Sequence, residues 1–480
     1  MAQSQSQAQS QAQSQAQSGK SAYKGYVRTK DARVLAAPPS EAGLSGWLYH
    51  NIFESMSNFS SPAAAIGSLL MAVFTVLIAW FGISITWSLV DFAFISAVWS
   101  DPDGLKREAC WTVDQGGQLP SGWHGACWPF VAAKMKFVMY GAYDNDQLWR
   151  VNVTGIIGII ALGWTMIETL PYRRLAGIFL LTAYPVLATF LLTGGNFDIS
   201  YEDLVTVIVV GLALITAGRL SDRGFLGAFL AQISALFGVS GWLLIAYAVV
   251  AGLLGADAGL RHIPTNDWGG LLVTLVVAVT GIVAALPLGI VLALGRRSQM
   301  PIARILSTIF IEFWRGVPLI TVLFMASVML PLFLPEGVNF DNLLRALVGV
   351  MLFSAAYMAE VVRGGLQAID SGQFEGADAV GLSYWQSMRL IILPQALTHV
   401  IPGIVNTFIG LFKDTTLVSI IGLFDLLGAM QAAINDVAWA SPVQAHTGYL
   451  FIAALFFVFC FGMSRYSIYT ENKLSRDRKH

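Results

Sequence analysis

The chain has 480 residues, of which 56% are hydrophobic and only 12% are charged, and its mean hydropathy is +0.65. Because soluble chains carry about 25% charged residues, this composition excludes a soluble globular protein. The 28 basic and 29 acidic residues give a formal net charge of −1. The chain therefore has no surplus of basic residues that would indicate nucleic acid as a partner.

Residues 1–45 predict a disordered cytoplasmic tail, because Met1–Ser18 repeats Gln, Ser and Ala and has no apolar stretch. The same absence argues against a secretory signal. Residues 18–21 read SGKS, like the end of a nucleotide-binding P-loop, but that motif also needs Gly where Ser14 stands and a preceding strand. No other P-loop is visible, so any ATP that drives this protein must bind to another chain.

Apolar runs predict about ten membrane-spanning helices, since a spanning helix needs about 20 apolar residues. The runs are Ala64–Val90, Val151–Leu170, Leu175–Gly195, Leu204–Gly218, Gly241–Ala256, Trp268–Gly295, Gly316–Pro335, Leu344–Val362, Leu397–Phe412 and Tyr449–Ser464. Phe225–Phe237 leaves open a further interfacial or re-entrant segment. The expected fold class is all-α, a polytopic helix bundle of the inner membrane.

Basic residues follow alternate spans, which predicts the cytoplasmic side of the membrane for these loops. They are Arg173, Arg174, Arg219, Arg223, Arg296, Arg297, Arg304, Arg363, Arg389, Lys473, Arg476, Arg478 and Lys479. The opposite loops are acidic or neutral, with Arg261 as the main exception. This pattern predicts a multi-pass protein with both termini in the cytoplasm.

The predicted extracytoplasmic loop, residues 91–150, contains Cys110 and Cys127 in a tryptophan-rich stretch. Two cysteines in one such loop can form a disulfide worth roughly 3 kcal/mol; the alternative is two free thiols buried among aromatic side chains. His124 completes no convincing zinc ligand set. The aromatic residues suggest an interfacial belt or a loop core, and less readily a platform for a soluble binding protein.

The segment EGADAVGLSYWQSMRLIILP, Glu375–Pro394, predicts two short helices outside the membrane. Gly381 suits a left-handed turn between them, and Ser383 can cap the second helix. Pro394 is expected to open the following span. An apolar stripe is predicted on the second helix, from Leu382, Trp385, Met388, Leu390 and Ile391.

This segment resembles the cytoplasmic coupling loop of permease subunits of bacterial ABC importers, which reads E-A-A, three residues, G, nine residues, I-x-L-P. The matching positions are Glu375, Ala377, Gly381, Ile391, Leu393 and Pro394, with Gly376 in place of the first Ala. The resemblance implies that residues 370–394 dock into an ATPase subunit dimer, which binds ATP and Mg, while this chain binds no cofactor. The acidic start and Trp385 would supply ionic and apolar anchors. The alternative is an incidental amphipathic helix.

Three further segments are similar to the polar amino-acid permease family: IEFWRGVPLI (Ile311–Ile320), the run Ser354–Ser383, and Leu393–Gly422 with its KDTTLV. In the N-terminal half, YVRT (Tyr26–Thr29) and the cysteine-bearing loop, together with ALGRRSQMP (Ala293–Pro301), resemble the M-type subunit of general L-amino-acid importers.

The resemblance implies accessory membrane helices in residues 46–262 and a five-helix permease core in residues 263–480. It also implies three further partners besides the lipid bilayer and the ATPases: a second, homologous permease subunit that makes a heterodimer, a periplasmic amino-acid-binding protein, and the transported amino acid. The chain would then move substrate across a bacterial inner membrane by alternating access.

Ionisable groups within spans are costly, so they face protein or water and often a pathway. Lys413, Asp414 and Thr415 interrupt an apolar stretch after Asn406, which predicts a broken helix whose groups suit a zwitterion; the alternative is a buried structural pair. Arg315 precedes Gly316 and Pro318. It is either an anchor at a helix break or part of a gate.

Glu360 and Arg363 are three residues apart on a predicted helix and can pair. We expect this pair to fix the coupling region rather than to contact substrate.

Two other classes of protein were weighed. A secondary transporter would show paired, repeated halves, and no repeat is visible. A membrane enzyme would need a reactive constellation, but the six histidines are scattered without metal-ligand spacing. A transporter permease subunit is therefore predicted rather than an enzyme.

Overall fold

The computed structural model describes residues 62–101, 103–167, 169–195, 197, 201–222, 234–256, 259–333 and 340–477. The predicted tail, residues 1–45, and most of Phe225–Phe237 lie outside these ranges. The chain divides into two compact units, Met1–Leu89 and Val90–His480, and each is described by itself.

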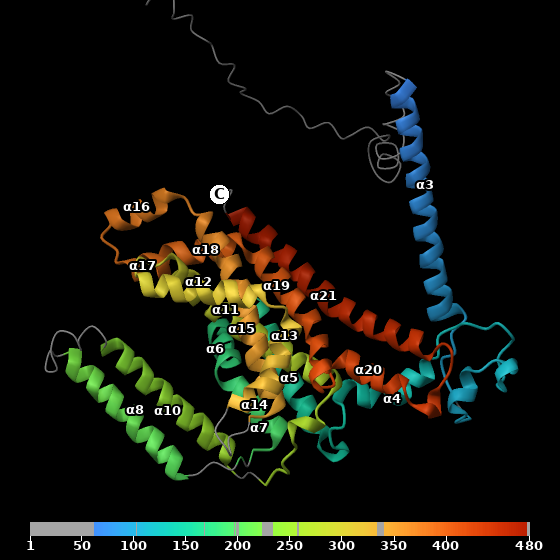
Figure 1. Cartoon of the computed structure of the whole chain (residues 1–480), viewed down its shortest axis with the longest axis horizontal. Coiled ribbons are helices and arrows are strands. Elements are labelled where there is room, and N and C mark those ends of the chain that lie inside the picture. The colour runs from blue at the N-terminus through green and yellow to red at the C-terminus, as the bar shows by residue number, and fades with distance from the viewer. Residues whose placement is uncertain are drawn as a thin grey trace, which may run out of the picture. The chain divides into compact units, whose positions relative to one another are not determined.

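The described part of the first unit is helix α3, Pro62–Val90 (Figure 1). Large apolar side chains are exposed on all its sides, among them Leu70, Trp80 and Trp87. A helix that is apolar all round is buried in protein or in lipid. The window Val73–Ile95 has the length and hydropathy of a membrane span.

The second unit is a helix bundle (Figure 1). Its α-helices are α4 Trp128–Tyr140, α5 Leu148–Met166, α6 Arg173–Leu181, α7 Ala183–Thr193, α8 Tyr201–Asp222, α10 Ser234–Gly255, α11 Gly270–Arg297, α12 Pro301–Gly316, α13 Leu319–Phe324, α14 Leu330–Phe333, α15 Asn342–Gln367, α16 Ser371–Ala379, α17 Tyr384–Ser387, α18 Leu393–His399, α19 Ile401–Asp414, α20 Leu426–Ile434 and α21 Gln444–Asp477. The π-helical turns are η3 Asp91–Ile95, η8 Met325–Met329 and η9 Met388–Ile392, and the short 3-10 helices are η4 Lys106–Cys110, η5 Val113–Gln115, η6 Asn145–Gln147, η7 Thr265–Asp267, η10 Thr415–Ile421 and η11 Val437–Trp439.

A helix lies at each of the ten predicted apolar runs. Within the described ranges, six helices are long and apolar enough to cross a membrane, or up to eight if each of two bent pairs counts as one span. The predicted runs in α8 and α10 are shorter apolar helices, Leu204–Ala217 and Ser240–Gly255. The prediction of a polytopic all-helical membrane bundle is confirmed, while the number ten remains a prediction.

The predicted span Leu175–Gly195 consists of two helices, α6 and α7, which meet at 49°. Pro185 explains the bend, because its ring clashes with the carbonyl four residues earlier and that residue, Leu181, is the last of α6. The prediction for Leu397–Phe412 was also inaccurate. The spanning helix begins only at Ile401, after α18 has ended, and continues to Ile421.

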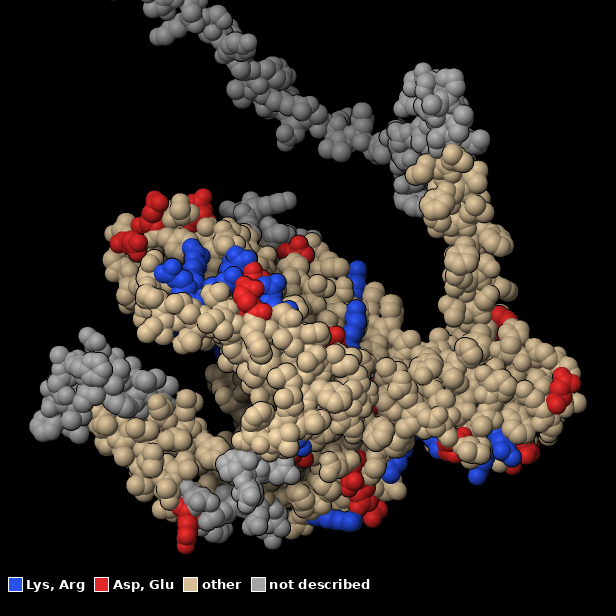
Figure 2. All heavy atoms as spheres, viewed as in Figure 1, with Lys and Arg blue, Asp and Glu red and all other residues tan. Residues whose placement is uncertain are grey.

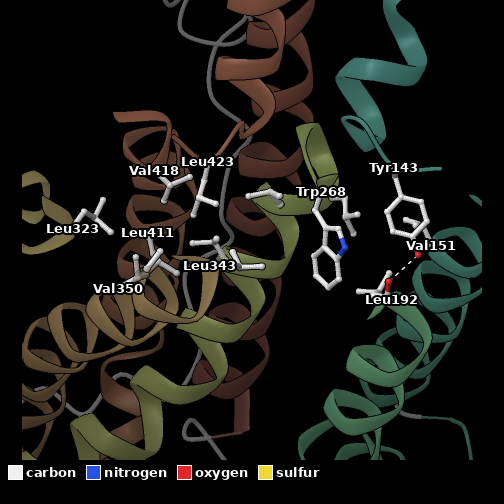
Figure 3. Close-up of a cluster of buried hydrophobic side chains, with 14 of the residues drawn as sticks. Tyr143, Val151, Leu192, Trp268, Leu323, Leu343, Val350, Leu411, Val418 and Leu423 are labelled. Carbon is white, nitrogen blue, oxygen red and sulfur yellow. Dashed lines mark hydrogen bonds between the residues drawn. The ribbon is translucent and has the colours of Figure 1, made fainter. Parts of the chain in front are cut away.

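One buried cluster joins helices from both halves of the chain. Trp268 is almost fully buried, and Figure 3 shows its indole between two groups of side chains. One group is Tyr143, Val151 and Leu192, and the other includes Leu343, Val350 and Leu411. The Tyr143 hydroxyl also donates a hydrogen bond to the carbonyl of Leu192, at 2.9 Å. The N-terminal helices and the later ones therefore share one core.

Helices α11 and α15 pack closely because glycines face the neighbouring helix. A Cβ placed on Gly289 would lie 2.7 Å from the Cβ of Met358, and one on Gly281 would lie 3.1 Å from Val350. Small residues let helix backbones approach in membranes, where packing contacts replace the hydrophobic driving force between helices. This pair forms the centre of the bundle that carries the coupling loop.

Candidate coupling loop and polar groups of the bundle

The predicted coupling loop is two helices, α16 and α17, joined by a tight turn. The Asp370 carboxylate accepts a hydrogen bond from the backbone N–H of Gly372, at 2.7 Å, and so caps α16. Gly381 has φ +80°, the left-handed conformation predicted for it. Ser383 and Gln386 form a capping box that starts α17, with the Gln386 side chain accepting from the Ser383 N–H at 2.9 Å.

The loop is anchored to the bundle by a few apolar side chains. Ala377 is buried, as are Met388 and Ile392 on the π-helical turn η9. Met388 and Ile392 belong to a cluster that also contains Met358 and Leu366 of α15. Ala377 lies near the end of α16, so these contacts hold the end of α16 and the end of the loop, while Val380 and Trp385 between them are exposed.

Arg297 provides a second anchor, from the end of α11. Its guanidinium lies 5.0 Å from the centre of the Phe374 ring on α16 and donates a hydrogen bond to the carbonyl of Leu366, at 2.8 Å. A cation over an aromatic face contributes about 0.5–2 kcal/mol, depending on solvent exposure. The position of α16 is thus tied directly to a membrane helix.

The outer surface of the loop combines a carboxylate with large apolar side chains. Glu375 is exposed, and so are Val380 (79%), Trp385 (67%), Leu390 (64%) and Tyr384 (50%). Clustered exposed apolar groups rimmed by polar residues mark interaction sites. Figure 1 shows α16 and α17 at one end of the bundle, and the charged side chains on the visible face in Figure 2 gather there and at the opposite end.

The predicted single apolar stripe on the second helix was wrong. Met388 points inward, whereas Trp385 and Leu390 face outward. The reason is the π-helical turn at Met388–Ile392, which changes the angular spacing of side chains between α17 and α18. Leu393 and Pro394 follow it as the first residues of α18, so Pro394 opens a short helix before the span proper.

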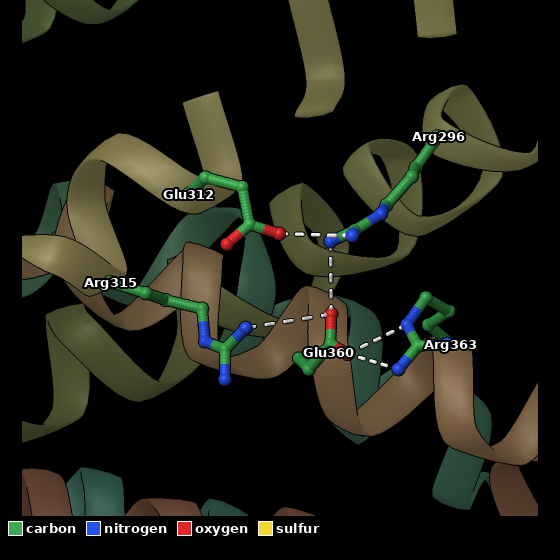
Figure 4. A network of polar contacts seen from close by, with 5 residues as sticks. All are labelled: Arg296, Glu312, Arg315, Glu360 and Arg363. Atoms are coloured by element: carbon green, nitrogen blue, oxygen red, sulfur yellow. Dashed lines mark hydrogen bonds and ion pairs between the residues drawn. The ribbon is translucent and has the colours of Figure 1, made fainter. Parts of the chain in front are cut away.

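Charged side chains of α11, α12 and α15 form one network beside the loop (Figure 4). At its centre, Glu360 accepts from Arg363 (Nε to Oε1, 2.7 Å) and from Arg296 (Nη1 to Oε2, 3.3 Å). Arg315 lies 3.8 Å from Glu360, and Arg296 also pairs with Glu312 at 2.9 Å. The predicted Glu360–Arg363 pair is therefore present, but it belongs to a larger set that joins three helices.

The remaining predicted path residues lie on α19 and at the start of η10. Asn406 and Lys413 are exposed and seven residues apart, which places them on one face of α19. Asp414 is half-buried, and Thr415 is buried with its hydroxyl donating to the carbonyl of Phe412, at 2.8 Å. The helix is not broken here as predicted, because the chain continues from Thr415 as a 3-10 helix.

Cys110 and Cys127 are joined by a disulfide in the structure, with their Cα atoms 5.9 Å apart. Both sulfurs are buried in a cluster with Leu426 and Trp439 of the α20 region. The Cys127 N–H also donates to the Thr447 hydroxyl of α21, at 3.0 Å. The loop is thus packed against the C-terminal helices rather than free.

A charged pair joins the same two regions. The Lys134 ammonium of α4 donates to the carboxylate of Asp436, between α20 and η11, and holds the pKa of Asp436 below its usual value. No group of three or more potential metal ligands occurs among the residues that the structure describes.

For Arg296 and Arg297 the sequence predicted only a place in the basic pattern and in the segment ALGRRSQMP. Both contact the coupling region, Arg296 through the network and Arg297 through α16. Their position directly after the longest apolar run was a usable signal, because long cationic side chains at the end of a span can reach neighbouring helices.

Comparison with known proteins identifies the family. Residues 285–471 match the model for "Binding-protein-dependent transport system inner membrane component", a range that includes the coupling loop. The chain is 40% identical to the inner membrane amino-acid ABC transporter permease protein YhdY of Escherichia coli (strain K12), over 93% of this chain and 98% of that protein.

The chain is also 41% identical to the glutamate/glutamine/aspartate/asparagine transport system permease protein BztC of Rhodobacter capsulatus, over 95% of this chain and 99% of that protein. A crystal structure of an amino acid ABC transporter with histidines aligns with 42% of this chain and 92% of its own, at 29% identity and a TM-score of 0.38. The family model and the two sequence relatives confirm a transporter subunit rather than an enzyme. The chain belongs to the family of ABC transporter permeases that form the inner membrane component of binding-protein-dependent transport systems.

Proposed function

We propose that this protein is the permease subunit of an amino-acid importer and that ATPase subunits bind to its α16–α17 loop. The exposed Trp385, Val380 and Leu390 carry the proposal, because such side chains outside the spans need a protein partner to cover them. Glu375 beside them supplies an ionic contact. The names of the relatives YhdY and BztC support amino acids as the substrate class.

The assembly we propose contains this chain, a second homologous permease, an ATPase dimer that binds ATP and Mg, and a periplasmic amino-acid-binding protein. The N-terminus and the C-terminus lie in the cytoplasm, on the side of the coupling loop. Basic residues support this orientation, because Arg297 contacts Phe374 of α16 and cytoplasmic loops carry the excess of Lys and Arg. Arg296 and Arg304 belong to the same predicted basic loop. Residues 46–262 act as accessory helices to the core in residues 263–480.

The substrate path is proposed to run along α19. Asn406 and Lys413 are exposed there in the isolated subunit, and an amide and an ammonium on one face suit the carboxylate of an amino acid. Asp414, next to Lys413, is available for the ammonium. Arg315 and Thr415 already have partners within the chain, so we assign them structural roles. The second permease would complete this path.

The coupling role is tested with Glu375→Lys in the complete importer reconstituted into vesicles. We expect normal insertion and loss of the ATPase stimulation that the binding protein causes, because the change reverses a charge at the contact. Asp103→Lys is the matched control, since Asp103 is also an exposed acidic residue but lies in the loop that bears the disulfide. Undiminished transport by Glu375→Lys contradicts the role of the loop.

A further inference from the structure

Helix α12 has an apolar face that the rest of the chain does not cover. Ile302, Ile305, Leu306, Ile309 and Phe313 follow the spacing of one helix face, and their exposed fractions lie between 52% and 74%. On a helix of 16 residues this is one continuous outward stripe.

The opposite face of α12 fixes how the helix is turned. Ile311 is fully buried there. Arg315 pairs with Glu360 of α15, and Ser307 packs so closely on α11 that a Cβ on Gly295 would lie 2.2 Å from its Oγ. The apolar stripe cannot rotate inward without breaking these contacts.

The direction and position of α12 exclude a straight membrane crossing. A straight crossing would require α12 and the apolar segment that follows it to form one helix. Instead, α12 meets the following segment, Leu319–Phe333, at 102°. Pro318, which lacks an N–H and restricts the residue before it, follows the end of α12 and accounts for this turn.

Both ends of α12 are connected to membrane helices. It starts four residues after α11 ends at Arg297, and α13 starts three residues after α12 ends at Gly316. A helix perpendicular to the next span, placed where one span ends and another starts, lies at the level of the membrane surface. Arg304 lies in its first turns, with Nε donating to the carbonyl of Ser298 at 3.1 Å, and is exposed toward this level.

From this geometry we infer that α12 lies in the plane of the membrane, with the stripe Ile302–Phe313 inserted among the lipid acyl chains. Its occupant is the bilayer itself rather than a protein partner. Ile320 and Phe324 of the following segment are also exposed apolar side chains, and the inference places them against the same lipid. The Arg296–Glu312–Glu360 contacts then hold an interfacial helix against the span that carries the coupling loop.

The inference is tested by placing a single NBD-labelled cysteine at Ile309 in the assembled permease–ATPase complex in liposomes. The free Cys460 is first replaced by Ser, and the disulfide is kept. Lipids with a nitroxide at mid-chain are the quencher for the membrane, and iodide is the quencher for water. Val113 on η5 of the disulfide loop, which is 62% exposed and lies away from the coupling loop, is labelled in the same way as the control.

We expect nitroxide lipids to reduce NBD emission at Ile309 and iodide to leave it unchanged, with the opposite result at Val113. A label at Ile309 that iodide quenches overturns the inference. So does a label that lipids quench only in the isolated permease, because a protein partner then covers the stripe in the complex. The label reports only where residue 309 lies, so the test does not depend on a charged substitution in α12, which the protein would have to tolerate.

Discussion

Replacement of Trp385 by alanine should weaken the binding of the ATPase to the permease. The side chain is 67% exposed, which corresponds to about 130 Å² of a Trp that buries ~200 Å² when fully covered. At about 25 cal/mol per Å², its complete covering by a partner contributes ~3 kcal/mol. The dissociation constant should therefore rise by roughly two hundredfold at most.

The assay is titration of the ATPase onto permease in nanodiscs, with wild type, Trp385→Ala and Trp385→Phe compared. The phenylalanine variant should retain most of the affinity, since it keeps an aromatic ring at the contact. Trp99→Ala is the matched control, because Trp99 is also exposed (57%) but lies in the disulfide loop. Unchanged affinity of a correctly folded Trp385→Ala variant refutes the assignment of this side chain as an anchor.

Two further predictions concern stability. Gly289→Ala should lower the thermal unfolding temperature in detergent, because the new Cβ would lie 2.7 Å from the Cβ of Met358. Gly163→Ala is the control and should leave this temperature unchanged, because a Cβ at Gly163 would meet no atom within 4 Å. Equal effects of the two substitutions contradict the close packing at Gly289. Because Lys134 lowers the pKa of Asp436, stability from this pair is fully present above the ordinary aspartate pKa of about 3.9 and is lost as the pH falls through the lowered value. Asp436→Asn should therefore unfold at a lower temperature than wild type at pH 7, with the difference vanishing in acid; a difference that persists in acid means that the ion pair is not its source.

The sequence predicts the membrane helices and the coupling turn well because both depend on local chemistry. Apolar runs must be helical in lipid, since each backbone group needs a partner within its own segment. Gly381 and Ser383 define a helix end and a helix start by conformation and capping, and the structure has both. These features need no knowledge of distant residues.

Features that depend on tertiary contact were not predictable in this way. Arg150 is fully buried in α5, where both Nη atoms donate to the carbonyl of Arg261 at 3.0 Å, a partner 111 residues away. The π-helical turn that moves Trp385 away from Met388 leaves no plain signature in residue spacing. The role of Arg296 depends on the packing of α11, α12 and α15, which a periodicity analysis treats as separate helices.

The disulfide loop also joins parts of the chain that lie far apart in the sequence. Trp111 donates to the Ala440 carbonyl at 2.8 Å, and Lys134 reaches Asp436, so the early and late parts of the chain are fastened together at the end of the bundle opposite α16 (Figure 1). These contacts hold one end of the bundle in a fixed arrangement. If a partner displaces α16 as the proposed function requires, the displacement would have to be taken up by the helices between the two ends rather than at this fastened end.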